Sequence, residues 1–239
     1  MKTIIALILA LIISVSAFSQ VSESGDLNKK FYIRGGLSYP TWTYYGYKNA
    51  NALKDSLGAE SRIGGIFEIG AIFMLNGINV GDNMRFGINV DFVSFKTQIF
   101  NLSGSKNLYN FFVGSKIGPS FTYAPTKALA FDVFVKLNPV WVGATYLNHQ
   151  DFDNGLDVYY GYAQLMYSVG INVDLAVMYL GFEYDFGGLK LKNNDGMYFD
   201  PLRPDLESWE DPLNPEINPQ MNATKVPMHG FNVTFGFNF

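Results

Sequence analysis

The chain of 239 residues contains no cysteine. This absence excludes a disulfide framework, a thiol nucleophile and cysteine metal ligands together. Charged residues are also scarce, at 16% of the chain against about 25% in ordinary globular domains. Only two histidines occur, His149 and His229, so catalysis by imidazole has few options. The formal net charge of −4 gives no electrostatic reason to expect nucleic acid as a partner.

Long hydrophobic runs are missing except at the N-terminus. There, Lys2 precedes an apolar stretch from Ile4 to Ile13, and small residues precede Gln20. This order is typical of a cleaved secretory signal peptide. We therefore expect residues 1–19 to be removed and residues 20–239 to form one exported domain. Because no cysteine follows the predicted cleavage site, a lipoprotein anchor is not expected.

The feature that the chain does have is the alternation of apolar and polar residues. The first alternating segment is FYIRGGLSY, from Phe31 to Tyr39. Further alternating segments lie at residues 62–73, 85–92, 109–118, 131–138, 159–170, 180–186 and 230–239. A period of two residues is typical of β-strands with different surroundings on their two faces. The sequence therefore predicts eight strands.

The connections between these segments alternate in length. Those after the second, fourth and sixth segments are short, whereas the others are mostly longer and more polar and lie near residues 40–61, 101–108, 147–157 and 187–227. Short turns at one end and long loops at the other are typical of an antiparallel meander. We expect an all-β fold, an eight-stranded antiparallel up-and-down transmembrane β-barrel with both termini at the short-turn end.

One face of the predicted strands carries charges of both signs. These residues are Arg34, Glu68, Arg85, Asp91, Lys116, Asp132, Lys136, Glu183 and Asp185. The other face carries large apolar residues, with tyrosine and tryptophan near the strand ends, among them Tyr39, Tyr123, Trp141 and Tyr179. A soluble barrel around an apolar cavity would turn the apolar face inward. The paired charges favour the reverse, a polar lumen inside a lipid-facing wall with aromatic girdles.

The last segment, HGFNVTFGFNF, places its apolar residues on one face. These residues are Phe231, Val233, Phe235, Phe237 and Phe239. In a soluble domain such a face would be an aggregation hazard. Lipid removes that hazard, so we expect this strand to pair with Phe31 to Tyr39 and close the barrel.

Several motifs together resemble a known family. They are the Ser19-Gln20 end of the signal peptide, the strand FYIRGGLSY, the strand end KIGPSFTY and the terminal Phe239. The mature chain resembles the small outer-membrane β-barrel proteins of the PorT-like and OmpA/OmpX-like group. The resemblance implies outer-membrane localisation, contact with outer-membrane lipid, and insertion by the barrel-assembly machinery with the last strand as its signal. It implies no particular biochemistry.

Catalytic motifs of known outer-membrane enzymes do not match this chain. Lipid A deacylases use a His-x-Ser pair and omptin-type proteases use an Asp-His pair, whereas the chain has NHQDFD around His149 and MHGFNV around His229. We predict no catalytic, cofactor-binding or metal-ligating residue, with an outer-membrane hydrolase acting on lipid or peptide as the alternative. The acidic segment DFDNGLD, Asp151 to Asp157, departs from an EF-hand because Gly155 occupies a ligand position. Whether it binds calcium stays open.

The last long loop is rich in proline and acidic residues. Its stretch FDPLRPDLESWEDPLNPEINP contains Asp205, Leu206 and Trp209, which we predict to contact a protein or ligand at the cell surface. The expected function is therefore a structural role or loop-mediated binding at the cell surface. A narrow channel is a further alternative.

Overall fold

The computed structural model describes residues 29–41, 60–102, 106–126, 128–148, 157–192 and 226–239. Strands account for nearly all of these residues. No helix within these ranges is long and apolar enough to cross a membrane. The predicted signal peptide and the central parts of the four predicted long loops lie outside the described residues.

The strands form one wall and one small ladder. Their bounds are β1 Lys29–Pro40, β2 Glu60–Arg62, β3 Gly64–Asn79, β4 Met84–Leu102, β5 Lys106–Thr126, β6 Leu129–Asn148, β7 Asp157–Leu175, β8 Met178–Phe186, β9 Gly188–Leu189, β10 Val226–Pro227 and β11 Gly230–Asn238. Strands β2 and β3 share one position in the wall, because both pair with β4 and only Ile63 separates them. Strands β9 and β10 pair only with each other, which leaves eight positions in the wall.

The wall is a closed barrel. Each of its strands pairs antiparallel with the strand before it, and β1 pairs with β11 from Tyr32↔Asn238 to Pro40↔Gly230. The hydrogen bonds between β1 and β11 end with the Phe239 N–H, which donates to the Phe31 carbonyl at 2.8 Å. The predicted all-β, eight-stranded antiparallel up-and-down barrel is confirmed. Because the first and last strands pair, neither leaves an open edge.

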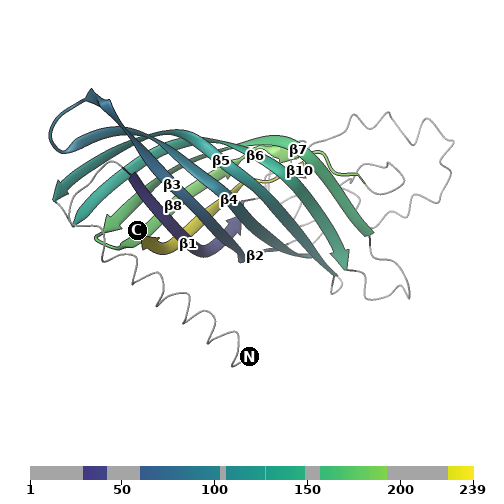
Figure 1. Ribbon diagram of the computed structural model, residues 1–239. Coiled ribbons are helices and arrows are strands. Elements are labelled where there is room, and N and C mark those ends of the chain that lie inside the picture. Colours follow the sequence, from purple (N-terminus) through teal and green to yellow (C-terminus); the bar gives the residue numbers. More distant parts are fainter. Residues whose placement is uncertain (1–28, 42–59, 103–105, 127, 149–156, 193–225) are drawn as a thin grey trace, which may run out of the picture.

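The two ends of the barrel differ. At one end, β3–β4, β5–β6 and β7–β8 are joined by short turns, and the C-terminus lies at this end in Figure 1. The turn between β7 and β8 contains Ala176, which has a positive φ of 56°. At the other end the wall is uneven, because β5 and β6 have 21 and 20 residues whereas β8 and β11 have 9 each. We call these the short-turn end and the long-loop end.

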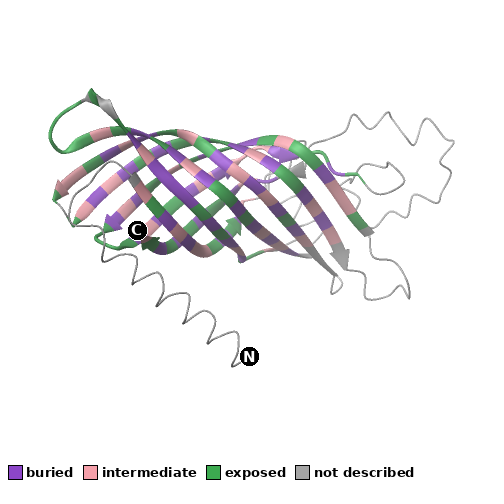
Figure 2. Cartoon of the chain, viewed as in Figure 1, coloured by how far each residue is buried: buried purple, intermediate pink, exposed green. Residues whose placement is uncertain are grey.

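Burial alternates along the strands in the sense of a transmembrane barrel, as the stripes of Figure 2 show. On β6, Val133, Val135 and Leu137 are 49%, 53% and 48% exposed, whereas Phe134 and Lys136 between them are 1% and 0% exposed. Buried charged residues and exposed apolar residues are the reverse of a water-soluble domain. The outer face therefore suits lipid.

Irregularities reverse the alternation within three long strands, one of them in β6, where Trp141 and Val142 are both exposed. In β4, a bulge at Phe92 and Val93 turns both side chains outward, after which Ser94 and Lys96 point into the lumen. In β7, Ala163 has a positive φ of 51°, and here Gly161 is buried while Tyr162 is exposed. The single unbroken alternation predicted for residues 159–170 is therefore wrong. A bulge adds one residue to a strand and exchanges its faces.

Candidate functional site

Arg34 of β1 lies at the centre of the lumen. Its Nε donates to Glu68 Oε2 at 2.5 Å and its Nη2 to Glu183 Oε2 at 3.0 Å. Its Nη1 donates to the Tyr179 hydroxyl at 2.9 Å and to Asn172 Oδ1 at 3.3 Å. A buried guanidinium needs such partners for its donors, and here three strands besides its own, β3, β7 and β8, supply them.

Glycines on the inner face make room for this side chain. Gly236 of β11 is the neighbour of Arg34 across the closing ladder, and a Cβ there would lie 2.7 Å from Arg34 Cα. Gly181 of β8 is placed similarly, since its Cβ would lie 2.4 Å from Thr234 Oγ1 and 3.1 Å from Arg34 Nη1. Eight strands enclose a lumen only wide enough for side chains, so large ones need small neighbours.

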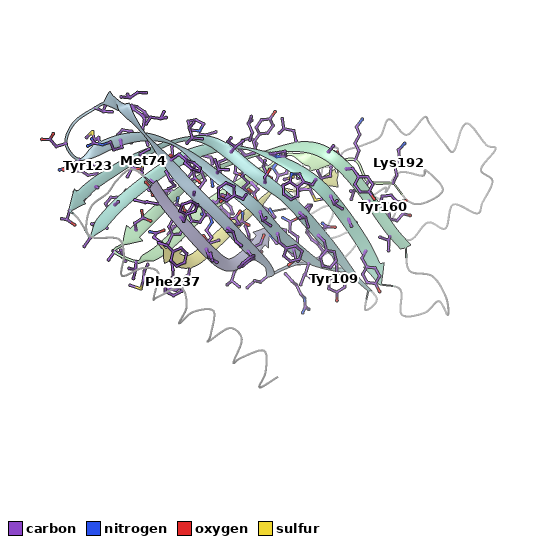
Figure 3. The ribbon with its side chains drawn as sticks, viewed as in Figure 1. Met74, Tyr109, Tyr123, Tyr160, Lys192 and Phe237 are labelled. Atoms are coloured by element: carbon purple, nitrogen blue, oxygen red, sulfur yellow. The ribbon has the colours of Figure 1, made fainter. Side chains whose placement is uncertain are left out.

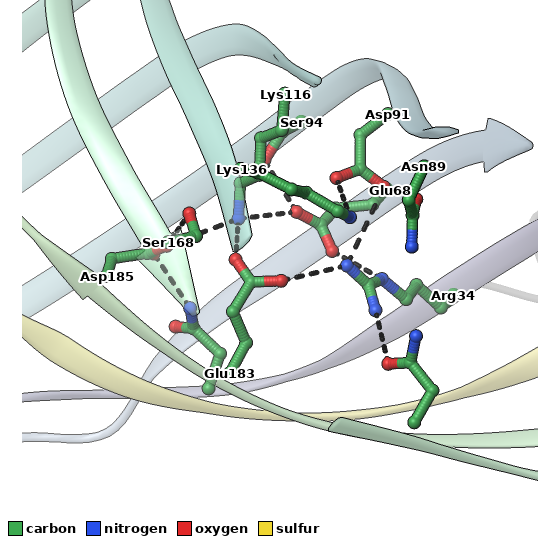
Figure 4. Close-up of polar contacts among 12 residues, drawn as sticks. Arg34, Glu68, Asn89, Asp91, Ser94, Lys116, Lys136, Ser168, Glu183 and Asp185 are labelled. Atoms are coloured by element: carbon green, nitrogen blue, oxygen red, sulfur yellow. Dashed lines mark hydrogen bonds and ion pairs between the residues drawn. The ribbon is translucent and has the colours of Figure 1, made fainter. Parts of the chain in front are cut away.

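Lys116 of β5 extends the charged cluster across the lumen. Its Nζ lies 2.8 Å from Glu68 Oε1 and 3.4 Å from Asp185 Oδ1, and it also pairs with Glu183. Asp185 accepts in turn from Ser168 Oγ at 2.6 Å and Asn232 Nδ2 at 2.8 Å. Figure 4 shows these contacts from strands on opposite sides of the barrel.

Two further lysines complete the cluster. Lys96 Nζ lies 2.6 Å from Asp185 Oδ2, and Lys136 Nζ lies 2.6 Å from Asp91 Oδ2. Asp91 also accepts from the Tyr32 hydroxyl. We call this set the lumen network; its members are Arg34, Glu68, Asp91, Lys96, Lys116, Lys136, Glu183 and Asp185. Its four cations and four carboxylates balance, which low-dielectric surroundings require.

The short-turn side of the network is packed with rings and aliphatic groups. Tyr32 and Tyr179 stack with their ring centroids 5.1 Å apart, and Ile72 and Met74 join them in one buried cluster. Arg34 lies 5.3 Å and 5.4 Å from the two ring centroids, so it also makes cation–π contacts. This cluster fills the cross-section between the network and the short turns.

The long-loop side of the network is closed by an apolar set that we call the outer plug. Its members are Phe100, Phe112, Val140, Met166, Leu189, Leu191 and Met228, all of them buried. Between the plug and the network, a cavity of about 10 Å³ is lined by Phe112, Val140 and Met166 together with Lys96, Lys116 and Asp185. This volume is about the size of one water molecule, so it provides no passage.

Two plug residues come from the segment 187–192, which we call the strap. Leu189 and Leu191 lie over inward-facing glycines of the wall, and a Cβ at Gly143 would come 2.4 Å from Leu189 Cδ1. Next to Ala163 of β7, the Gln164 amide donates to the Lys190 carbonyl and accepts from the Lys190 N–H, each at 2.7 Å. The Gln164 amide therefore makes the two hydrogen bonds that the backbone of a paired strand would make, and it attaches the strap to the wall.

A backbone bridge holds the outer end of the strap. The Tyr160 N–H donates to the Lys192 carbonyl at 2.8 Å, and the Lys192 N–H donates back at 2.9 Å. Figure 3 shows Tyr160 and Lys192 together at the long-loop end. Residues 187–192 and 226–227 lie within the predicted loop 187–227, which joins β8 to β11. Leu189, Leu191 and the following Met228 are buried inside the barrel.

Eight of the nine charged residues predicted for the lumen lie there, all of them buried. The exception is Arg85, for which the prediction is wrong. Arg85 is on the inward face but next to a short turn, where its Nη1 donates to the Gly81 and Met84 carbonyls. Its neighbours in the turn are exposed to solvent, so its charge needs no partner inside the barrel.

Sequence reasoning missed three lumen charges, Lys30, Lys96 and Asp174. Lys96 follows the bulge in β4, so a fixed period of two assigns it to the wrong face. Lys30 and Asp174 lie just beyond the ends of the predicted segments, and they pair at 2.6 Å. Their alternation with Phe31 and Val173 is the signal that could have extended those segments.

The predicted girdle residues divide into two groups. Tyr39, Tyr123 and Trp141 are exposed on the outer surface near the strand ends, and Figure 3 shows Tyr123 at the short-turn end. Tyr179 is buried in the lumen as a partner of Arg34, so its assignment to the girdle is wrong. Tyr179 was assigned to the girdle because it lies just after a turn. It shares the inward parity of Gly181 and Glu183.

The apolar face of the last strand points away from the lumen. Phe231, Val233, Phe235 and Phe237 are 55%, 44%, 50% and 37% exposed, and Phe239 is half-buried. Asn232 and Thr234, which alternate with them, are buried inside. The strand that closes the barrel therefore has the polarity of the rest of the wall.

The remaining sequence predictions concern residues near or beyond the described ranges. His229 is half-buried before β11, its ring centroid 6.4 Å from that of Tyr184. His149, Asp205, Leu206 and Trp209 lie outside the described residues, as does the DFDNGLD segment except for its last aspartate. Among the described residues, no group of three or more His, Cys, Asp or Glu side chains is arranged to hold a metal ion.

A closed antiparallel wall, an apolar exterior and a filled, charged interior define the class of this chain as a transmembrane β-barrel. No family model and no curated protein match the sequence. Solved structures with a similar outline exist. The crystal structure of Ail, the attachment invasion locus protein of Yersinia pestis, has a TM-score of 0.47 at 11% identity, covering 89% of this chain and 100% of that one.

Two other structures have a comparable outline. Neisserial surface protein A has a TM-score of 0.43 at 12% identity, covering 87% of this chain and 97% of that one. The outer-membrane protease OmpT of Escherichia coli has a TM-score of 0.41 at 10% identity, covering 92% and 97%. At these scores the likeness assigns no residue and no activity to this chain.

Proposed function

We propose that this chain is an integral outer-membrane β-barrel whose barrel is a closed support and whose function lies in its surface loops. The observation that carries the proposal is the filled lumen: ring cluster, balanced ion network and outer plug follow one another along its axis. The predicted signal peptide supports export, and the lipid-facing wall supports a place in the outer membrane.

The strap supports the assignment of function to the last long loop. It anchors the chain on one side of residues 193–225, and β10, which pairs with β9, anchors it on the other. A rigid base presents a loop for binding at a lower entropic cost than a free tail does. Asp205, Leu206 and Trp209 remain the residues that we propose for the contact with a protein or ligand.

The other roles carry less support. A narrow channel would need the outer plug and the lumen network to rearrange, since buried side chains of both occupy the lumen. A hydrolase would need a nucleophile with a base and an orienting partner, for which neither histidine has a matching motif. Membership of the PorT-like group is proposed on the sequence motifs alone.

Planar-bilayer recording tests the closed barrel. We expect the purified protein to insert without stepwise current, and a reproducible current at modest voltage would contradict the proposal. Shortening Leu189, Leu191 and Met228 to alanine together removes bulk from the outer plug, and we expect this variant to remain closed as well, because the lumen network stays in place.

Replacement of residues 193–225 by a short flexible linker tests the division of labour. We expect the variant to remain membrane-inserted and to migrate differently on gels when heated, because the strap and β10 are retained. A partner that cross-links to Trp209 in the wild-type protein should no longer bind the linker variant. It should not bind the double variant Leu206→Ala, Trp209→Ala either. Failure of the linker variant to insert would contradict the proposal.

A further inference from the structure

Charge is balanced at the centre of the lumen but not at its short-turn end. The lumen network is neutral, with each carboxylate facing a cation. At the short-turn ends of β1, β6 and β7, Lys30 faces both Asp132 and Asp174. Among these three side chains, one negative charge is therefore in excess.

The two carboxyl groups are unequally supported. Asp174 receives Lys30 Nζ at 2.6 Å on Oδ2 and Asn238 Nδ2 at 3.1 Å on Oδ1. Asp132 accepts from Thr122 through Oδ1, whereas its Oδ2 has no hydrogen-bond partner and lies 4.0 Å from Lys30 Nζ. Asp132 is fully buried. An ionised carboxylate oxygen buried without a donor is strongly destabilising.

The groups around the pair limit what can neutralise it. Asp132 and Asp174 lie on the neighbouring strands β6 and β7, two residues apart in register, and both face the Lys30 ammonium. The ammonium of Lys30 already occupies the near side of Asp174, where it would repel a metal cation. The described residues also supply no third acidic or imidazole ligand. A hydrogen ion needs no further ligands and fits between two carboxyl oxygens.

We propose that Asp132 and Asp174 bind one hydrogen ion between them at neutral pH, which makes this pair a proton-binding site at the short-turn end of the lumen. One carboxyl group donates the proton to the other, so the orphaned oxygen gains a partner. With Lys30 charged, the three side chains Lys30, Asp132 and Asp174 together then carry no net charge. Two carboxylates that share a site cannot both ionise readily, which gives the pair its affinity for a proton.

The remaining neighbours do not titrate near neutrality. Those that face the pair are Lys30 of β1, Thr122 of β5, Asn238 of β11, and Tyr179 of β8, which is the ladder neighbour of Asp174. Met74 of β3 and Arg85 of β4 lie beside Thr122, and the Arg85 guanidinium donates to the Gly81 and Met84 carbonyls of the turn. Tyrosine, lysine and arginine titrate about three units or more above neutral pH, and the others carry no titratable group. The carboxyl pair is therefore the group that changes charge.

The pair couples the stability of the barrel to the pH of the compartment it faces. The native pair holds one more proton than the same two aspartates do in the unfolded chain at neutral pH. Stability therefore falls as pH rises through the release of that proton. Lys30 is partly exposed, which gives water at the short-turn end access to the site.

Infrared spectroscopy and unfolding of the full barrel in lipid vesicles test the proposal. We expect a protonated-carboxyl C=O band at neutral pH that is lost in Asp132→Asn, a substitution that also removes the fall in stability toward alkaline pH. Asp174→Asn provides a second variant if the first does not fold. As a control, Asp91→Asn lies in the balanced network and should keep both the band and the pH dependence.

Absence of the band from the wild-type barrel, or its persistence in both aspartate variants, would overturn the proposal. Chelation separates the proton from a metal ion. If a chelator lowers the stability of the wild-type barrel and not that of Asp132→Asn, a divalent cation occupies the pair and the proposal is wrong.

Discussion

At the scale of single residues, glycines on the two faces of one strand have different tasks. Gly35 and Gly36 are neighbours in β1. A Cβ at Gly35 would meet its nearest atom at 3.7 Å, an ordinary contact, whereas a Cβ at Gly36 would lie 2.0 Å from the Val233 carbonyl oxygen. The inner glycine is needed because the wall curves tightly and its backbones approach each other there.

Alanine at these two positions therefore gives a matched test. We predict that Gly36→Ala destabilises the barrel by about 1–3 kcal/mol or more through overpacking. Gly35→Ala should change stability by no more than about 0.5 kcal/mol. Urea unfolding in vesicles, followed by tryptophan fluorescence, measures both. Equal effects of the two substitutions would contradict the assignment of inner and outer faces.

The buried residues of the lumen network are stable in their charged form because partners of opposite charge face them. Lys136→Met leaves Asp91 with the Tyr32 hydroxyl but without its closest cation. We predict a loss of about 3–5 kcal/mol of stability, the usual cost of an uncompensated buried charge. The double variant Lys136→Met, Asp91→Asn should recover much of that loss in the same unfolding assay.

A control for that experiment lies outside the lumen. Lys190 is exposed on the strap, so Lys190→Met should leave stability almost unchanged. If Lys136→Met were as harmless as Lys190→Met, the lumen network would not be a paired core.

At the scale of elements, Gln164 attaches the middle of the strap to β7, and the backbone bridge between Tyr160 and Lys192 holds its outer end. Gln164→Leu removes both hydrogen bonds to the Lys190 backbone. We predict that trypsin then cleaves the folded barrel after Lys190 or Lys192 at least several-fold faster, because proteolysis requires a locally opened chain. Mass spectrometry of the fragments identifies the cleavage site.

The neighbouring residue provides the control. Leu165 is exposed on the outer face, so Leu165→Ala changes the same strand without touching the strap. Equal cleavage rates of Gln164→Leu and Leu165→Ala would contradict the role of Gln164 and mean that the Tyr160–Lys192 bridge holds the strap without it.

The elements also show what sequence periodicity can and cannot predict. The strands around Phe31, Phe131 and Phe231 were predictable, because a period of two sets each face as long as the ladder is regular. The inward position of Lys96 was not, since a bulge depends on how two strands align and not on the local pattern. The strap was not predicted for a related reason. The Gln164 side chain attaches it to β7, and a single side-chain contact leaves no periodic pattern in the sequence.

The lumen site was predictable in composition but not in pairing. Charges of both signs on one face predicted an ion-paired interior, and most of the residues named for it lie there. Which acid faces which base depends on the tilt of strands across the barrel. Arg34 of β1, for example, meets Glu183 of β8 from a strand two positions away in the wall.

At the scale of the whole molecule, the central claim is that the barrel is inverted relative to a soluble protein. Every structural feature above follows from this: the lipid-facing aromatic wall, the neutral ion network and the need for small residues on the inner face. The claim can be tested along one strand, because β6 alternates between exposed and buried residues over its whole central part.

The absence of cysteine makes that test clean, since each introduced cysteine is the only thiol in the chain. Spin labels at Val133, Val135 and Leu137 should be accessible to oxygen dissolved in lipid and shielded from a water-soluble nickel complex. A label at Ser168, on the inner face of β7, should be shielded from both. Labels on β6 that respond to the water-soluble reagent and not to oxygen would contradict the transmembrane barrel directly.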